Sequence, residues 1–385
     1  MKRFGCIALA LVVFFSVLPL VALGVEQPKL EVAGKSALLM DIATGRVLYE
    51  NNPHARLAPA SVTKVMTMLL IMEAIDSGKI SMDDTVTTSE AAAAKGGSQV
   101  YLKVGETMTV ADMLKSIAVS SANDCACAMA EHIAGSETAF VEQMNGRAKE
   151  LGMEDTNYVN CTGLDDSADA ANHLTSAHDI AIVSRELMLH HPDIQKFTTI
   201  WMDSVRNGAF GLSNTNKLVR FYPGATGLKT GFTSGAGYCL SATAQRDGLG
   251  LIAVVMGCES SQDRFQACKT MLDYGFANYA LVTPQLSTPL SVEVKLGKEA
   301  SVAAQPGEVT PLLIDKAHKS SITTEVTLAE APTAPISRGQ RLGTMTVRAG
   351  NQVLMQIPLV AEKEVLRLSF GDLFLFVMRK LCLGK

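Results

Sequence analysis

The sequence predicts an α+β domain with an antiparallel sheet flanked by helices and a helical subdomain, followed by a small all-β sandwich domain and a C-terminal amphipathic helix. Three observations lead to this fold class. Strand-like apolar runs stand at both ends of residues 25–282, with helical patterns between them. Short strand-like segments fill residues 283–361, and apolar residues recur at helical spacing in residues 362–385. The length of 385 residues also favours two globular units over one.

The first 24 residues read as a secretory signal peptide. Lys2 and Arg3 precede an uncharged stretch from Phe4 to Gly24, which ends in small residues. The stretch is also long enough to be an uncleaved membrane helix. Both interpretations export the rest of the chain, so we expect an extracytoplasmic protein.

Residues 25–282 alternate between strand and helix signals. SALLMD (36–41) and GRVLYE (45–50) predict a β-hairpin, and a helix follows with Pro59 in its first turn. Further helices are expected at 110–119, 122–134, 137–151 and 176–190. After Gly224 come three apolar runs, the last two joined by an Asp247-Gly248 turn, and then a helix at 261–279.

The remaining residues predict a separate unit and a terminal helix. The segments LSVEVKL, TPLLI, SITTEVTL, RLGTMTV and QVLMQIPL favour a β-sandwich over residues 283–361. In residues 362–385, the apolar stripe is interrupted by charges well before the ~20 residues that a membrane span needs. We expect this helix to lie flat on a membrane surface, and the alternative is a helix docked on the domain.

Charge and cysteine content exclude several functions. The net charge of −4 offers no basic surface, so we expect no nucleic-acid partner. Of eight cysteines, Cys6 lies in the predicted signal, which leaves an odd number. Cys125 and Cys127 would point to different faces of a helix, and no second ligand pair follows them. Buried free thiols are favoured over a disulfide framework, and we predict neither a metal nor a cofactor.

A serine and a lysine one helical turn apart, Ser61 and Lys64 in ASVTKVMT, suggest a nucleophile and its base. Residues at i and i+3 of a helix share one face. A lysine becomes a base when burial and the positive end of a helix disfavour its charged form. The pair alone is a weak signal, because such spacing also occurs by chance on solvated helix faces.

Two further motifs strengthen the signal. Ser121-Ala122-Asn123 stands at the junction of two predicted helices, and Lys229-Thr230-Gly231 lies in a predicted strand. S-x-x-K, S-x-N and K-T-G in this order are the signature of penicillin-binding proteins and class A β-lactamases.

The stretches LAPASVTKVMT, AVSSANDCACAMAEHIAGS, TGLDD (162–166) and NTNKLVRFYPGATGLKTGFTSGAGYCLSATAQRDGLGLIAVVMG resemble the D-alanyl-D-alanine carboxypeptidases, the low-molecular-mass penicillin-binding proteins. The resemblance implies a β-lactamase/DD-peptidase-like fold with a C-terminal β domain and an anchor helix. It also implies a peptidoglycan stem pentapeptide as substrate, β-lactams as inhibitors, and attachment to the outer face of the cytoplasmic membrane.

The resemblance further implies roles for the motif residues. Ser61 would attack the carbonyl between two D-alanines, with Lys64 as its base, and water would hydrolyse the acyl-enzyme. Ser121 would relay a proton to the leaving amine, and Asn123 would hold the substrate amide.

The strand residues would bind the rest of the substrate. Lys229 and Thr230 would meet the terminal carboxylate, and Gly231 would allow close backbone approach. The backbone N–H of Phe232 would form the oxyanion hole with that of Ser61. Arg264 matches an arginine that assists carboxylate binding in relatives, and its alternative is a surface helix arginine.

Two rival functions remain. A β-lactamase would need a glutamate that activates the deacylating water. Glu154 lacks the asparagine that normally follows that glutamate, and Asp165 and Asp166 stand nearby instead. A non-enzymatic β-lactam sensor is the second rival, which the complete set of side chains disfavours.

Overall fold

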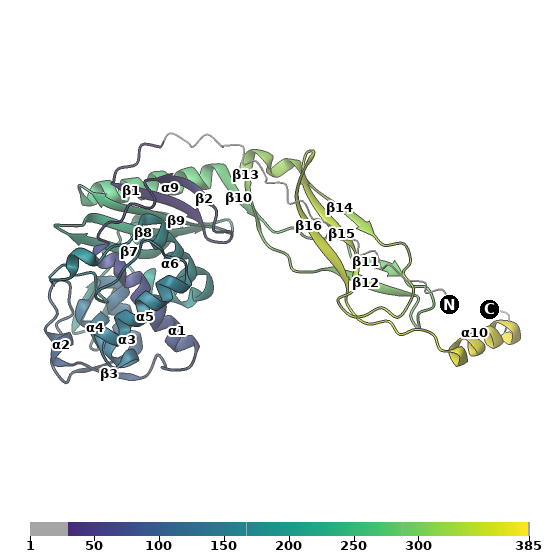
Figure 1. The fold of residues 1–385 in the computed structure, drawn as a ribbon, viewed down its shortest axis with the longest axis horizontal. Coiled ribbons are helices and arrows are strands. Elements are labelled where there is room, and N and C mark those ends of the chain that lie inside the picture. Colours follow the sequence, from purple (N-terminus) through teal and green to yellow (C-terminus); the bar gives the residue numbers. More distant parts are fainter. Residues whose placement is uncertain (1–29, 167, 287, 384–385) are drawn as a thin grey trace, which may run out of the picture.

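The computed structural model describes residues 30–166, 168–286 and 288–383. The predicted signal peptide lies outside them. Figure 1 shows the α+β unit at one end of an elongated molecule, a β-rich unit beside it, and the last helix at the far end.

A five-stranded antiparallel sheet forms the framework of the α+β unit, in the order β2-β1-β9-β8-β7. Its strands are β1 (Ser36–Asp41), β2 (Val47–Asn51), β7 (Ala225–Thr233), β8 (Gly237–Arg246) and β9 (Leu249–Cys258). The predicted hairpin and the three runs joined in part by the Asp247-Gly248 turn are therefore confirmed. Strand β7 lies at one edge of the sheet.

Both faces of the sheet are buried. Along β9, Ile252 and Val254 belong to the core shared with the helical subdomain, whereas Leu251 and Ala253 belong to the core under α9 (Ser261–Asn278). Successive side chains of a strand point to opposite faces, so a strand covered on both sides must be apolar throughout.

The helical subdomain covers the other face. The longer helices are α1 (Lys64–Asp76), α3 (Val110–Ser120), α4 (Asn123–Ala134), α5 (Glu137–Glu150) and α6 (Ala177–His190). Short elements complete it: β3 (Thr85–Thr87), α2 (Glu90–Ala93), β4 (Thr107–Thr109), η2 (Ala170–Asn172), η3 (Pro192–Ile194), α7 (Gln195–Thr198), β5 (Met202–Val205), β6 (Phe210–Ser213) and α8 (Leu218–Phe221). The four predicted helices between 110 and 190 are confirmed within two residues at each end.

The start of α1 differs from the prediction. Pro59 does not occupy the first turn of an α-helix, because a 3₁₀ turn, η1 (Ala60–Thr63), precedes α1. The motif serine lies in η1, and the motif lysine is the first residue of α1. Because side chains three apart eclipse one another in a 3₁₀ turn, the two side chains still share one face.

The β-rich unit contains a second antiparallel sheet, in the order β11-β12-β16-β15-β14, and a two-stranded ribbon of β10 and β13. The elements are β10 (Tyr279–Val282), β11 (Leu290–Glu293), β12 (Ser301–Pro306), β13 (Leu312–Asp315), η4 (Lys316–Ser321), β14 (Ile322–Leu328), β15 (Arg341–Ala349) and β16 (Gln352–Ala361). All five predicted strand segments are strands, and β10 and β12 are additional ones.

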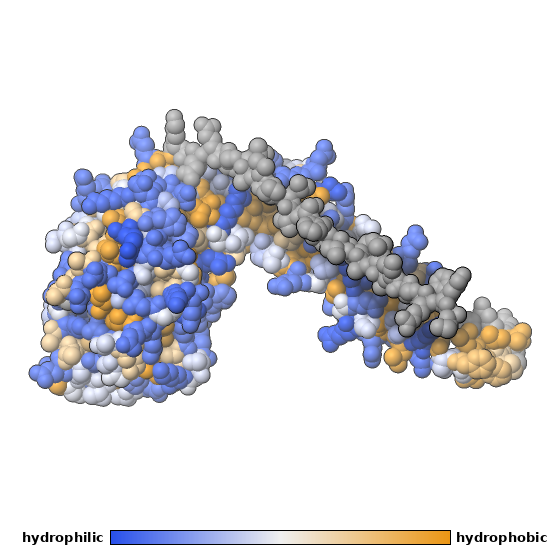
Figure 2. All heavy atoms as spheres, in the orientation of Figure 1, coloured by the Kyte–Doolittle hydropathy of each residue, from blue (hydrophilic) through white to orange (hydrophobic). Residues whose placement is uncertain are grey.

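Helix α10 (Phe370–Leu383) ends the described chain. Seven of its apolar side chains are exposed, among them Phe370 at 86% and Leu381 at 75%, and Figure 2 shows an apolar tip of the molecule at this helix. This exposure does not fit a helix docked on the domain. Within the described residues, none of the helices has the length and apolar character needed to cross a bilayer.

Candidate active site

Ser61 and Lys64 face each other where η1 passes into α1. Nζ of Lys64 lies 2.9 Å from Oγ of Ser61 and 2.7 Å from the carbonyl oxygen of Thr162. The lysine side chain is fully buried, whereas the serine is half-buried. The hydroxyl is thus the accessible member of the pair.

Burial lowers the pKa of Lys64 to about 7. A substantial fraction of its amine is then neutral at neutral pH. A neutral amine has two N–H groups and one lone pair. Because the Thr162 carbonyl accepts one N–H, the lone pair can be directed at the Ser61 hydroxyl, which is the arrangement that a general base requires.

Ser121 and Asn123 present polar atoms that have no partner in the described protein. Ser121 ends α3 in the left-handed conformation, with φ of 65°, and Asn123 begins α4. Oγ of Ser121 and Oδ1 of Asn123 are buried without a hydrogen bond. Such atoms are costly in a folded protein, so their presence together indicates a site that a ligand satisfies.

The amide group of Asn123 is fixed by its other atom. Its Nδ2 donates to the carbonyl of Gly96 at 2.8 Å, and its backbone N–H donates to the carbonyl of Ser98 at 2.7 Å. These bonds orient Oδ1 as an acceptor for an incoming N–H group.

Strand β7 brings the K-T-G residues to the serine. A Cβ on Gly231 would lie 2.6 Å from the carbonyl oxygen of Pro59 and 3.1 Å from the backbone nitrogen of Ser61. Only glycine therefore permits this approach of strand and 3₁₀ turn.

Lys229 is buried in the same strand and donates to the Thr230 carbonyl at 3.0 Å. Burial, together with the positive charges of Lys64 and Arg264, lowers its pKa well below the usual value. Phe232 follows, half exposed and stacked on Tyr238 with ring centroids 4.3 Å apart.

Arg264 lies against β7. It is only 8% exposed, and its guanidinium donates to the carbonyl oxygen of Gly231 at 2.9 Å. It packs over Tyr238 and Phe265 as well. The alternative interpretation, a surface arginine, is therefore wrong, and the contact seen is with the strand backbone.

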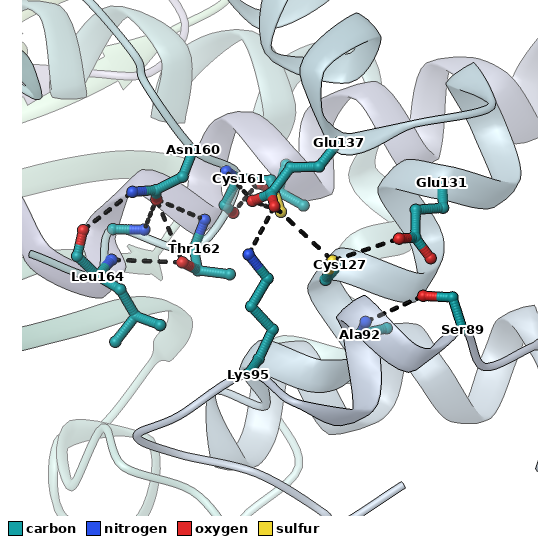
Figure 3. A network of polar contacts seen from close by, with 12 residues as sticks. Ser89, Ala92, Lys95, Cys127, Glu131, Glu137, Asn160, Cys161, Thr162 and Leu164 are labelled. Carbon is teal, nitrogen blue, oxygen red and sulfur yellow. Dashed lines mark hydrogen bonds and ion pairs between the residues drawn. The ribbon is translucent and has the colours of Figure 1, made fainter. Parts of the chain in front are cut away.

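The loop that carries Thr162 supports Lys64 through the Thr162 carbonyl. Figure 3 shows the side chains of this loop beside Glu137 and Lys95. Oδ1 of Asn160 accepts the backbone N–H groups of Thr162 and Gly163 at 3.1 and 2.7 Å, and so shapes the turn that aims the Thr162 carbonyl. Glu137, paired with Lys95 at 2.6 Å, accepts the N–H of Cys161 at 3.2 Å. The only signal in the sequence was the TGLDD stretch noted for its resemblance.

Gly163 and His173 contact η1 and fix its position. A Cβ on Gly163 would lie 1.8 Å from the carbonyl oxygen of Ala60, so no other residue fits. His173 accepts the N–H of Val159 at Nδ1, and its Nε2 lies 2.7 Å from Oγ1 of Thr63. Burial lowers the pKa of His173 to about 4, so the ring is neutral and acts as a structural bridge.

Glu154, the residue weighed for a β-lactamase, is exposed in the turn after α5 and lines a hollow there with Asn145 and Lys149. Among the described residues, no group of three potential ligands could hold a metal ion. Six cysteines are free and buried, as predicted: Cys125, Cys127, Cys161, Cys239, Cys258 and Cys268.

Comparisons with known proteins identify the family of the chain. A family profile described as D-alanyl-D-alanine carboxypeptidase matches residues 22–260, and one described as the C-terminal domain of penicillin-binding protein 5 matches residues 284–367. D-alanyl-D-alanine carboxypeptidase DacF of Bacillus subtilis is 43% identical over 353 residues, which are 90% of each chain. DacC of Escherichia coli is 33% identical, over 92% of this chain and 90% of that one.

Solved structures give the same result. Penicillin-binding protein 5 of Haemophilus influenzae has a TM-score of 0.73 at 29% identity, covering 88% of this chain and 99% of that chain. Penicillin-binding protein D2 of Listeria monocytogenes, solved with ampicillin bound, has a TM-score of 0.59 at 30% identity, over 65% of this chain and all of that one. The chain therefore belongs to the D-alanyl-D-alanine carboxypeptidase family, the serine-type peptidases that include the low-molecular-mass penicillin-binding proteins.

Proposed function

We propose that Ser61 is the nucleophile and Lys64 its general base in the removal of the terminal D-alanine from peptidoglycan stem pentapeptides. The observation that carries this assignment is the 2.9 Å separation between Nζ of Lys64 and Oγ of Ser61, with a pKa of the lysine lowered to about 7. A base of this pKa takes a proton at neutral pH without a cofactor.

The reaction then follows two steps. Lys64 takes the Ser61 proton as Oγ bonds to the carbonyl carbon, and the carbon–nitrogen bond breaks. The proton that Lys64 took then passes through Ser121 to the leaving amine, which departs as D-alanine and leaves Lys64 neutral again. Water then attacks the ester, and its proton returns through Lys64 while Oγ of Ser61 is released.

Binding roles follow from the unpartnered atoms and the strand edge. Oδ1 of Asn123 accepts the amide N–H of the substrate, and Lys229 and Thr230 hold the terminal carboxylate. The backbone N–H groups of Ser61 and Phe232 stabilise the oxyanion, at a factor of about 10² to 10³ for a donor of this kind. Arg264 acts on this site through Gly231 and through its positive charge.

Intact-protein mass spectrometry after incubation with benzylpenicillin tests the nucleophile. We expect one adduct on the wild type and none on Ser61→Ala. Ser77→Ala is the matched control, because this serine caps the end of α1 away from the site and should keep the adduct. An adduct that persists on Ser61→Ala would show that another residue is acylated.

The same samples separate the rival functions. Release of D-alanine from a D-Ala-D-Ala peptide, with a stable penicilloyl adduct, supports the carboxypeptidase. Multiple turnovers of a chromogenic cephalosporin would instead make the chain a β-lactamase, and no D-alanine release would leave a sensor. The exposed position of Glu154 favours the first outcome.

We further propose that residues 1–24 export the chain and that α10 holds it on the outer face of the cytoplasmic membrane. The exposed apolar side chains of α10 support the second role. A chain starting at Val25 should float with anionic vesicles, and Phe374→Glu should weaken flotation. The control is Val326→Glu, which should leave flotation unchanged, because Val326 is an exposed apolar residue of β14 and not of α10.

The unit boundaries are proposed as 25–282 for the catalytic domain, 283–361 for the β domain and 362–385 for the anchor. Limited proteolysis of the full chain should cut first in the connection between β10 and β11 and in the one between β16 and α10.

A further inference from the structure

The segment Asn214–Thr215–Asn216 runs beside the K-T-G strand and is fixed by its two asparagines. Nδ2 of Asn214 donates to the Ile200 carbonyl at 2.7 Å, and Nδ2 of Asn216 donates to the Gly227 carbonyl of β7 at 2.8 Å. Both asparagine side chains are buried. The backbone that carries Thr215 is therefore rigid.

Thr215 links the segment before the S-x-N motif to the K-T-G motif. Its backbone N–H donates to the Val119 carbonyl at 3.1 Å, two residues before Ser121. Its Oγ1 lies 2.7 Å from Oγ1 of Thr230, which donates to it. Thr215 is half-buried, and its hydroxyl lies against the K-T-G strand.

A hydroxyl has one hydrogen to donate and lone pairs that accept. In the free protein the single hydrogen of Thr230 goes to Thr215. A substrate carboxylate brings no hydrogen, so it needs the hydrogen of Thr230 for itself. Thr215 can then reverse its role and donate to Thr230, which keeps the Thr230 oxygen paired in both states.

We propose that Thr215 is a positioning residue that sets the preference of the site for substrates with a free terminal carboxylate, by supporting Thr230 as a hydrogen-bond donor. This inference rests on the proposed binding of the carboxylate by Lys229 and Thr230. Donors to a charged carboxylate form bonds roughly twice as strong as those to a neutral group, so the effect depends on the charge of the ligand.

The environment of Lys229 makes the hydroxyls more important. Its fully buried amine is held near two other cations, which disfavours its charged form before a ligand arrives. Part of the initial recognition of the carboxylate must then come from neutral hydrogen-bond donors. The hydroxyl of Thr230, next to Lys229 in β7, is such a donor.

The test measures acylation rate constants with benzylpenicillin and with its methyl ester, which lacks the negative charge. We expect the wild type to prefer the acid. Thr215→Val keeps the side-chain shape but removes the hydroxyl, and should reduce the ratio of acid to ester rates roughly tenfold. Thr215→Ser restores the hydroxyl and should restore most of the ratio.

A matched control exists on the same strand. Thr226 forms a hydroxyl pair with Thr243 at 2.8 Å, and Thr226→Val should leave the ratio unchanged. Thermal melting of each variant checks that it is folded. With a D-Ala-D-Ala peptide as substrate, Thr215→Val should raise KM or lower kcat/KM. The rate constant of deacylation should change less.

Three results would overturn the inference. If Thr215→Val slows acid and ester equally, the residue is structural only. If Thr215→Ser fails to restore the ratio in a folded protein, the hydroxyl is not responsible. If the wild type itself shows no preference for the acid, the carboxylate site at Lys229 and Thr230 is wrong, and this inference fails with it. Formation of the Ser61 adduct is unaffected by that last result, so the two failures are distinguishable.

Discussion

The pH dependence of acylation tests the central feature of the site, the buried amine of Lys64. Burial lowers its pKa to about 7 from a usual value near 10.5. Only the neutral amine can accept the Ser61 proton. The acylation rate should therefore follow the neutral fraction of Lys64, rising with pH and levelling off above about pH 8.

The magnitude follows from that pKa. With a value of about 7, roughly 90% of the amine is neutral at pH 8 and about 1% at pH 5, so acylation should fall about ninety-fold between them. A solvent-exposed lysine would be neutral in only about one molecule in 3,000 at pH 7. Burial thus raises the concentration of the active base by about three orders of magnitude.

Other ionisable groups of the site would not produce this profile. Lys229 becomes more positive as the pH falls, which favours carboxylate binding and acts in the opposite direction. His173 has a pKa lowered to about 4, so it stays neutral throughout the range from pH 5 to 8. The decline on acidification is therefore assigned to Lys64.

The assay is the second-order rate constant for labelling by a fluorescent penicillin, measured at constant ionic strength between pH 5 and 10. Circular dichroism at each pH confirms that the protein is folded. A rate that is flat from pH 5 to 8, or one that still rises tenfold per unit above pH 9, would refute the assignment of Lys64 as a buried base of lowered pKa.

Three substitutions test the supports of the site. Gly231→Ala places a Cβ 2.6 Å from the Pro59 carbonyl, so β7 must move away from η1 and penicillin labelling should fall about 10²-fold. Asn123→Ala removes the proposed acceptor for the substrate amide and should lower kcat/KM for a D-Ala-D-Ala peptide by about tenfold or more. His173→Ala leaves the Val159 N–H without a buried partner and Thr63 with only its bond to the Ala60 carbonyl, and urea unfolding should show a loss of about 2 kcal/mol. Unchanged labelling, kcat/KM or unfolding midpoint, respectively, would contradict each expectation.

Patterns that are local in the sequence predicted most of the elements. The hairpin at residues 36–51 and the strands around Asp247 and Gly248 carry turn residues between apolar runs, and the helices between 110 and 190 carry a clear period. Strand β12 was missed, because its two inward residues, Val302 and Ala304, give too short an alternation to stand out.

Contacts between distant segments were less accessible. The motif residues Ser61, Lys64, Ser121 and Lys229 were found because side-chain identity marks them. The carbonyl of Thr162 lies 98 residues from Lys64 in the chain, and a carbonyl carries no mark in the sequence. The same holds for Thr215, whose importance arises only from the fold that sets its hydroxyl beside Thr230.

Several residues of the site destabilise the folded protein, and the cause of each destabilisation explains the role of the residue. Ser121 adopts a left-handed backbone that costs roughly 1 kcal/mol, and two buried polar atoms, on Ser121 and Asn123, lack partners at about 1–3 kcal/mol each. Lys64 is buried where its charge is disfavoured. In the proposed mechanism, a substrate that supplies an amide N–H to Asn123 and a leaving amine to Ser121 meets groups that have already lost their water. The desolvation of these groups is already complete in the folded protein. Hydrogen bonds formed in the transition state therefore lower the barrier, because they do not replace hydrogen bonds to water.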